Sequence, residues 1–189
     1  MATQAERTAA TKSALMKAAL TIAAAEGIKN VTHRKVSMSA KVSVGTTSYH
    51  YQNLDSLLLD AFNQYIDESR DRYEHGVSSA RTPGELADAL IEMVNRHHSN
   101  TLEAILMYEL YAQAGRDPRY RALVQRWSRA TKTAVEHLYS AELATQLEAV
   151  VEGVLFQRLL GDSSLSDRQF RDLLLVILGQ ESTRPQQAG

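Results

Sequence analysis

The sequence contains no cysteine among its 189 residues. Disulfide bonds and thiolate metal sites are therefore excluded, and the composition suits a reducing compartment. Long apolar runs are missing as well: the longest aliphatic run is LLLVIL at residues 173–178, far short of the roughly 20 residues that cross a bilayer. Near the N-terminus Lys17 interrupts the apolar stretch, so that a signal peptide is not expected. We expect a soluble, cytoplasmic protein that does not enter a membrane.

Sustained alternation of polar and apolar residues, the pattern of strands, is also missing, and the chain has only three prolines. Apolar residues instead recur at helical spacing along almost every segment. Thr82 and Glu85, with Pro83 between them, form a helix-starting capping-box pattern, and Ser166 and Gln169 form another. The sequence therefore predicts an all-α fold, with helices over about residues 10–26, 32–40, 43–51 and 54–76, and further helices that begin near 83, 101, 118, 142 and 167.

Charge is unevenly distributed along the chain, although the net charge is only −1. Residues 1–52 hold seven lysines and arginines against two acids, whereas the remainder holds fourteen against twenty. A basic N-terminal segment on an acidic body indicates that the first segment meets a polyanion and the body does not.

The stretch SVGTTSYHY, residues 43–51, follows a short expected helix after a break at residues 41–43. Two short helices joined by a tight turn after a longer one are the layout of a helix-turn-helix. Its small core is expected from Val36, Ala40, Val42, Thr47 and Tyr51. The outward residues of the third helix are then hydroxyl, imidazole and small groups that suit phosphate oxygens and base edges: Val44, Gly45, Thr46, Tyr49 and His50.

The run THRKVSMSAKVSVGTTSYHYQNLDSLLLDAF, residues 32–62, resembles the signature of TetR-family transcriptional repressors. The match covers about residues 8–62 and rests on these residue types in order: Thr32, Arg34, Val42, Gly45, Thr46, Tyr49, His50, Tyr51, Asp55, Leu57 and Leu58. The rest of the chain matches only in architecture. Two positions depart from the family pattern: Ser48 stands where an aromatic is common, and Leu54 where a phosphate-binding lysine is common.

The resemblance implies a division of labour among the DNA-binding residues. Thr32, Tyr49 and His50 are expected to clamp phosphates. The base-reading set is expected to be Arg34, Val44, Gly45 and Thr46, with His33 and Ser43 as additions. Because Leu54 replaces a lysine, Lys12, Lys35 or Lys41 is expected to take over part of the phosphate contact.

A second group of candidates lies on the expected helices after residue 53. These inward-facing aromatic and polar residues either pack the core or line a ligand pocket: Phe62, Tyr65, Met93, His97, Tyr108, Glu109, Tyr111 and Trp127. A buried histidine with a hydrogen-bond partner is the ordinary alternative for His97. A metal pair at His97 and His98 is not expected, because adjacent residues point to different sides of a helix and no third ligand is evident.

The last two expected helices are apolar on more than one side, and LLLVIL is apolar all round. One subunit's core covers one side, so we expect a second subunit to cover the other in a four-helix interface. The interface candidates are Leu147, Val150, Val151, Val154, Leu155, Phe170, Leu173, Leu174 and Ile177.

The sequence and the resemblance together predict a homodimeric, ligand-responsive repressor. Residues 1–52 form the expected helix-turn-helix DNA-binding domain, residues 53–189 the ligand-binding and dimerisation domain, and about 181–189 a disordered tail. The expected partners are a double-stranded DNA operator, a second copy of the chain and an unidentified small-molecule effector, with no cofactor and no metal. The alternatives are a ligand-independent DNA-binding or adaptor protein, and an enzyme. No nucleophile elbow, phosphate loop or metal spacing supports an enzyme.

Overall fold

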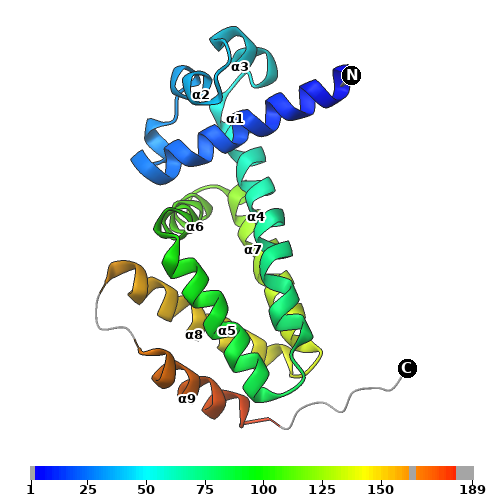
Figure 1. The fold of residues 1–189 in the computed structure, drawn as a ribbon, viewed down its shortest axis with the longest axis vertical. Coiled ribbons are helices and arrows are strands. Elements are labelled where there is room, and N and C mark those ends of the chain that lie inside the picture. Colours follow the sequence, from blue (N-terminus) through cyan, green and yellow to red (C-terminus); the bar gives the residue numbers. More distant parts are fainter. Residues whose placement is uncertain (1–2, 162–164, 182–189) are drawn as a thin grey trace. The chain divides into compact units, whose positions relative to one another are not determined.

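The computed structural model of the chain describes residues 3–161 and 165–181, and at 71–75 it describes the helix but not the side chains. Within these ranges the chain is helical and has no strand, which confirms the all-α prediction. The predicted tail lies outside the described residues beyond Glu181. The elements, labelled in Figure 1, are α1 (Gln4–Glu26), the 3-10 turn η1 (Ile28–Asn30), α2 (His33–Ala40), α3 (Val44–His50), α4 (Leu54–Ser79), α5 (Pro83–Ser99), α6 (Thr101–Ala114), α7 (Pro118–Glu136), α8 (Ala141–Leu160) and α9 (Asp167–Leu178).

Capping residues explain where most of these helices begin and end. α1 begins at Gln4, earlier than the expected start near residue 10, because Thr3 and Glu6 form a capping box. It ends at Gly27, whose φ of 87° is costly for a residue with a side chain. The box at Ser166 and Gln169, which opens α9, is confirmed.

The predicted capping box at the start of α5 is only half formed. The Thr82 hydroxyl accepts a hydrogen bond from the Glu85 amide at 3.2 Å, as expected. The Glu85 carboxylate, however, accepts from the amide of Arg81 at 2.8 Å rather than from that of Thr82. The first turn of α5 is thus capped one residue further upstream than the sequence pattern predicts.

The chain divides into two compact units, and three helices contribute to both. Unit 1 comprises Met1–Asp67 and Ile105–Val124, and unit 2 comprises Glu68–Ala104 and Gln125–Gly189. Unit 1 therefore joins the first three helices to the first half of α4, most of α6 and the start of α7. The domain boundary expected at residues 52 and 53 stays a prediction.

Within unit 1, α1 packs against α2 and α2 packs against α3. Of the five residues expected in this small core, Val36, Thr47 and Tyr51 are buried, and Ala40 and Val42 are half-buried. The buried face of α1 consists of aliphatic residues at helical spacing: Leu15, Ala18, Ala19, Ile22 and Ala23.

Within unit 2, α5 packs against α8 and α9, and α8 packs against α9. This packing places most of the expected interface residues in the core of the single chain, and the interface itself stays a prediction. Seven of the nine candidates are buried inside the single chain and belong to its own core: Leu147, Val151, Val154, Leu155, Phe170, Leu174 and Ile177. Val150 is half-buried and Leu173 is exposed. On α9 the buried Phe170, Leu174 and Ile177 recur at helical spacing with Asp172 opposite them, a pattern that the apolar run LLLVIL partly masks.

A buried arginine holds the start of α9 in unit 2. The Arg158 guanidinium donates to the Asp167 carboxylate at 2.8 Å, to the Leu165 carbonyl at 3.3 Å, and to the side-chain oxygen of Asn95. The Asn95 amide also donates to Asp167 at 2.8 Å. These hydrogen bonds, first from Asn95 and then from Arg158, lower the pKa of the Asp167 carboxyl below its ordinary value of 3.8.

In the described part of the chain, none of the helices combines the length and hydropathy needed to traverse a bilayer.

Candidate nucleic-acid interface

The candidate interface is built on the helix-turn-helix segment, residues 32–51. Thr32 caps α2, and its hydroxyl accepts from the amide of Lys35 at 3.2 Å. Ser43 caps α3, and its hydroxyl accepts from the amide of Thr46 at 3.0 Å. Between the two helices Lys41 has φ 56° and ψ 41°, which makes it the one non-glycine residue in the left-handed region among those described. The tight turn is therefore made at the expense of backbone strain.

A buried pair of hydroxyls joins the two helices. Ser37 donates to the His33 carbonyl at 2.6 Å, and the Ser37 and Thr47 hydroxyl oxygens are 2.7 Å apart. Since the single hydrogen of Ser37 goes to His33, Thr47 donates to Ser37 rather than to the Ser43 carbonyl, which is further away at 3.5 Å. Thr47 is the buried residue of α3, and this directional bond fixes the rotation of α3 against α2.

The outward face of α3 carries most of the predicted DNA contacts. Tyr49 is 83% exposed and Val44 is 48% exposed, which are large fractions for side chains of this kind. Gly45 is exposed, and Thr46 and His50 are half-buried. The Tyr49 and His50 rings meet edge to face, with centroids 5.2 Å apart.

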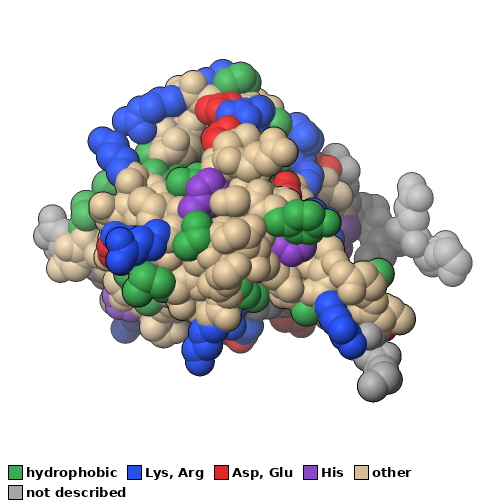
Figure 2. Space-filling view, turned by 90° about the horizontal axis from the view of Figure 1, so that it is seen from above, with side chains coloured by type: hydrophobic (Ala, Val, Ile, Leu, Met, Phe, Trp, Pro, Cys, Tyr) green, Lys and Arg blue, Asp and Glu red, His purple; other side chains and the backbone are tan. Residues whose placement is uncertain are grey.

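Arg34, on α2, is also exposed. Figure 2 shows lysine and arginine side chains spread around the margin of the face in view, with histidine and apolar side chains nearer its middle. A positive margin around polar and apolar groups is suited to a groove whose walls are phosphates.

The three candidate lysines differ in their intramolecular partners. Lys35 forms an ion pair with Glu26, with Nζ 2.5 Å from Oε2. Lys12 places its ammonium 5.6 Å from the centre of the Tyr51 ring, a cation–π contact. Lys41 is exposed in the turn, and Leu54, at the position of the family's lysine, is half-buried. The strained Lys41 is thus the best presented of the three for a phosphate.

His33 and Tyr51 hold the two ends of the segment together, which the sequence did not predict. The His33 ring donates through Nε2 to the Tyr51 carbonyl at 3.1 Å, so His33 ties the start of α2 to the end of α3. The Tyr51 hydroxyl donates to the Asp60 carboxylate of α4 at 3.1 Å. Burial and then the Asp60 charge raise the pKa of Tyr51 to about 12. Tyr51 therefore connects α3 to α4 in its protonated form.

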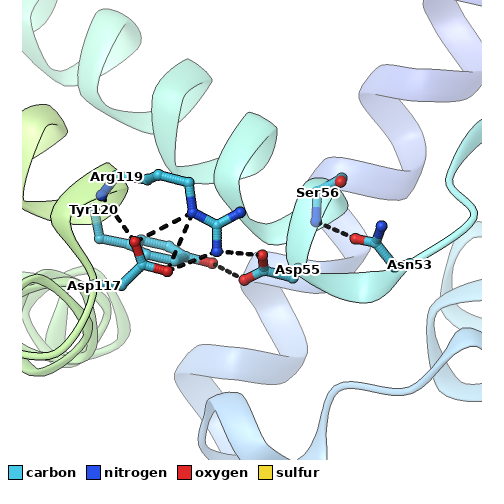
Figure 3. Close-up of polar contacts among 6 residues, drawn as sticks. All are labelled: Asn53, Asp55, Ser56, Asp117, Arg119 and Tyr120. Carbon is cyan, nitrogen blue, oxygen red and sulfur yellow. Dashed lines mark hydrogen bonds and ion pairs between the residues drawn. The ribbon is translucent and has the colours of Figure 1, made fainter.

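The first turn of α4 is tied to the start of α7, also within unit 1 (Figure 3). The Asn53 side chain caps α4 by accepting from the Ser56 amide at 2.8 Å, as predicted. Asp55 forms an ion pair with Arg119, with Oδ2 2.5 Å from Nη2. Arg119 also binds Asp117, the cap of α7. Sequence patterns point to the cap at Asp117, but nothing local connects Arg119 to a residue 64 positions earlier.

The eight candidate ligand residues fall into both units. Phe62, Tyr65, Tyr108, Glu109 and Tyr111 belong to unit 1, and Met93, His97 and Trp127 to unit 2. In unit 1, Phe62 and Tyr65 are buried, and the Tyr108 and Tyr111 rings meet edge to face at 5.9 Å. Glu109 reaches the end of α1, where a Cβ added to Gly27 would lie 3.5 Å from its Oε1.

In unit 2, Trp127 and His97 are buried. The Nδ1 of His97 lies 3.3 Å from the Met93 carbonyl, one turn earlier in α5. This is the contact expected of an ordinary buried histidine. The assignment of these eight residues to a ligand site stays a prediction.

Comparison with known proteins gives one family model and several solved structures. The model for the tetracyclin repressor-like C-terminal domain matches residues 81–180, more than half of the chain. SCO7518 from Streptomyces coelicolor A3(2), described as a transcriptional regulator, is 27% identical with a TM-score of 0.81 over 89% of this chain and 98% of that one. SCO1917 from the same organism, a member of the TetR family, is 28% identical with a TM-score of 0.75 over 88% and 97%.

The multidrug-binding protein EbrR, solved with imidazole, is 29% identical with a TM-score of 0.72 over 88% of this chain and 93% of that one. No curated protein matches the sequence. The family model covers the C-terminal part of the chain, and the solved relatives span both the helix-turn-helix segment and the helices that follow it. On this evidence the chain belongs to the TetR family of transcriptional regulators.

Proposed function

We propose that this regulator is a repressor that binds a palindromic operator as a homodimer and is released by a small-molecule effector. The observation that carries the DNA-binding part is the outward face of α3, where Tyr49 and Val44 are exposed on a helix fixed from behind by the Ser37–Thr47 bond. A short, rigidly held helix with exposed recognition side chains is what the major groove requires.

The DNA contacts divide into two kinds by chemistry. Arg34 has a forked donor that suits the O6 and N7 of guanine, and Val44 and Thr46 suit base edges and thymine methyl groups. Thr32, Tyr49 and His50 carry polar hydrogens for phosphate oxygens. Thr32 uses its oxygen to cap α2 and keeps its hydroxyl proton for donation.

The dimer is proposed to use the outer sides of α8 and α9, in place of the buried residues first expected. Phe156 and Leu160, four residues apart on α8, are 48% and 64% exposed. Leu173 and Val176, three residues apart on α9, are 36% and 67% exposed. Since α8 packs on α9, these residues supply two apolar stripes that a second copy would cover in a four-helix arrangement. A dimer also provides two recognition helices for half-sites about 34–36 Å apart.

The effector is proposed to be a flat aromatic cation. EbrR has been solved with ethidium, proflavin and malachite green, at 26–28% identity to this chain. The aromatic candidates of this chain and the carboxylate of Glu109 would suit the same chemistry, because π-faces and carboxylates both attract cations.

Two measurements test the proposal. Genome-wide capture of bound DNA should return a palindromic sequence, and its absence would remove the repressor reading. Titration of malachite green into free and operator-bound protein, with the operator duplex alone as the blank, should then give different dissociation constants, because linkage requires an effector that releases DNA to be weakened by DNA in the same proportion. A coupling of about 1–3 kcal/mol is ordinary. Equal constants would favour the ligand-independent DNA-binding protein.

A further inference from the structure

We propose that Arg119, together with Asp55, positions the recognition helix α3, although Arg119 lies 69 residues after the end of that helix in the sequence. The inference rests on the proposed DNA binding. It adds to the interface a pair of residues outside the helix-turn-helix segment, and it concerns unit 1 alone.

The Arg119 side chain is held in one orientation by the residue that caps its own helix. The Asp117 carboxylate accepts from the Arg119 amide at 2.8 Å, from Nε at 3.2 Å and from Nη2 at 2.6 Å. A guanidinium gripped at two nitrogens has little freedom to rotate. Its Nη2 consequently presents a fixed donor to Asp55 Oδ2 at 2.5 Å (Figure 3).

The other oxygen of Asp55 is bound by the next residue of α7. The Tyr120 hydroxyl lies 3.4 Å from Asp55 Oδ1, and the Tyr120 ring is 2% exposed. The same ring meets Phe62 of α4 edge to face, with centroids 5.9 Å apart. The start of α7 therefore grips α4 in its first turn through Asp55 and two turns later through Phe62.

The grip on α4 reaches α3 through a very short connection. Only Gln52 and Asn53 separate Tyr51, the cap of α3, from the first residue of α4. Tyr51 is itself bound to Asp60 of α4 by its hydroxyl. A shift of the first turns of α4 must accordingly move the end of α3, because a two-residue connection and the Tyr51–Asp60 hydrogen bond join the two helices.

The size of the effect follows from the exposure of the pair. Side-chain exposure is 53% for Arg119 and 48% for Asp55, and ion pairs at such positions contribute little to folding stability. Recognition of bases is more sensitive than folding to small displacements, because hydrogen bonds to base edges weaken steeply when misaligned. We expect Arg119→Ala to weaken operator binding roughly three- to tenfold, within the range of coupling between contacting residues.

The matched control is Arg116→Ala. Arg116 lies three residues earlier, in the turn between α6 and α7, but its guanidinium donates to the Ala112 carbonyl of α6 at 3.2 Å. Both variants remove one positive charge from this region, so the loss of the side-chain contacts to Asp55 and Asp117 distinguishes them. Fluorescence anisotropy with the captured operator and with a scrambled duplex should show a loss confined to Arg119→Ala and to the operator. Equal losses for both variants, or equal losses on both duplexes, would overturn the proposal.

A second variant separates positioning from simple neutralisation of the Asp55 charge. If Arg119 serves only to neutralise that carboxylate beside the DNA, Asp55→Asn should restore the binding of Arg119→Ala. If Arg119 positions α4, Asp55→Asn should instead show the same loss by itself, and the double variant should be no worse than either single one. Restoration by Asp55→Asn overturns the positioning role.

Hydrogen exchange makes the proposal testable without DNA. Arg119→Ala should raise exchange at the amides of α3 and the first turn of α4 severalfold above Arg116→Ala, and equal exchange would overturn the inference. Failure of the wild-type protein to bind any captured duplex would remove the proposed function, whereas the exchange measurement would still decide whether Arg119 fixes α3.

Discussion

Lys41 offers a direct test of the turn between α2 and α3. Its backbone lies in the left-handed region, with φ 56° and ψ 41°, where side chains crowd the following carbonyl. Glycine adopts this conformation without that penalty. Lys41→Gly should therefore relieve strain and remove one positive charge, whereas Lys41→Ala should remove the charge alone.

The expected magnitude combines two opposing terms. The left-handed conformation costs roughly 1–2 kcal/mol for a residue with a Cβ. Glycine also lowers the free energy of unfolding by about 0.4–1 kcal/mol relative to alanine, because it increases the conformational entropy of the unfolded chain. The net stabilisation of Lys41→Gly over Lys41→Ala should be about 0.5–1 kcal/mol, or about 1–4 °C in melting temperature for a chain of this size.

Operator binding should respond to the charge and not to the strain. Both variants should lower the slope of log K against log salt by about 0.9, the value for one phosphate contact. Lys29→Ala, which removes an exposed positive charge from η1, serves as the control and should leave the slope unchanged. Equal melting temperatures for the glycine and alanine variants would refute the strain argument. An unchanged salt slope in both would show that Lys41 does not meet a phosphate.

The remaining predictions concern recognition, assembly and acid stability. Arg34→Ala should cost about 1–3 kcal/mol of operator binding and relax the base preference, whereas Tyr49→Ala should weaken binding to all sequences alike. Competition with mutated operators distinguishes the two variants, and an equal loss of base preference in both would contradict the assigned roles. Val176→Glu should give a protein that is folded by circular dichroism and monomeric by light scattering, and a dimeric Val176→Glu protein would rule out this interface. Leu174→Glu places a charge at a position with 0% exposure in the single chain and should unfold unit 2. The pKa of the Asp167 carboxyl is lowered on folding, so its stabilisation is present above the ordinary value of 3.8 and is lost as the pH falls through the lowered value. Asp167→Asn should thus melt earlier than wild type at pH 7 and approach it in acid; a difference in melting temperature that does not shrink as the pH falls from 7 to below the ordinary value of 3.8 would contradict the argument.

Local signals in the sequence predicted the helices and their caps well. Thr32, Asn53 and Ser166 each cap the helix expected after them, since an N-cap depends on a hydrogen bond to a backbone amide within three residues. The exceptions are also local. α1 starts earlier than expected because Thr3 and Glu6 form a capping box that was not predicted. The Glu85 carboxylate accepts from the amide of Arg81 instead of the expected amide of Thr82.

Features that depend on distant residues were not predictable in the same way. Val151 and Leu174 share helix faces with the buried Leu147 and Phe170, whereas Leu160 shares a face with Glu142 and Val176 one with Asp172, so helical periodicity favours the observed sides, although the apolar run LLLVIL masks it. Packing against α5 buries the favoured sides of these helices. The contact between Asp55 and Arg119 likewise arises from the tertiary fold, because nothing in either local sequence specifies the partner.

The bond between Ser37 and Thr47 also bears on how a new operator specificity could evolve. Thr47 is the buried residue of α3, and the orientation of the helix is set from behind by one directional hydrogen bond. Exposed positions of the proposed base-reading set, such as Val44 and Arg34, have little packing to preserve, and substitutions at such sites usually change stability by no more than about 0.5 kcal/mol. Mutations there can therefore retune sequence preference while the helix keeps its pose, so that duplicated copies of this gene could diverge toward different promoters without first passing through unstable intermediates.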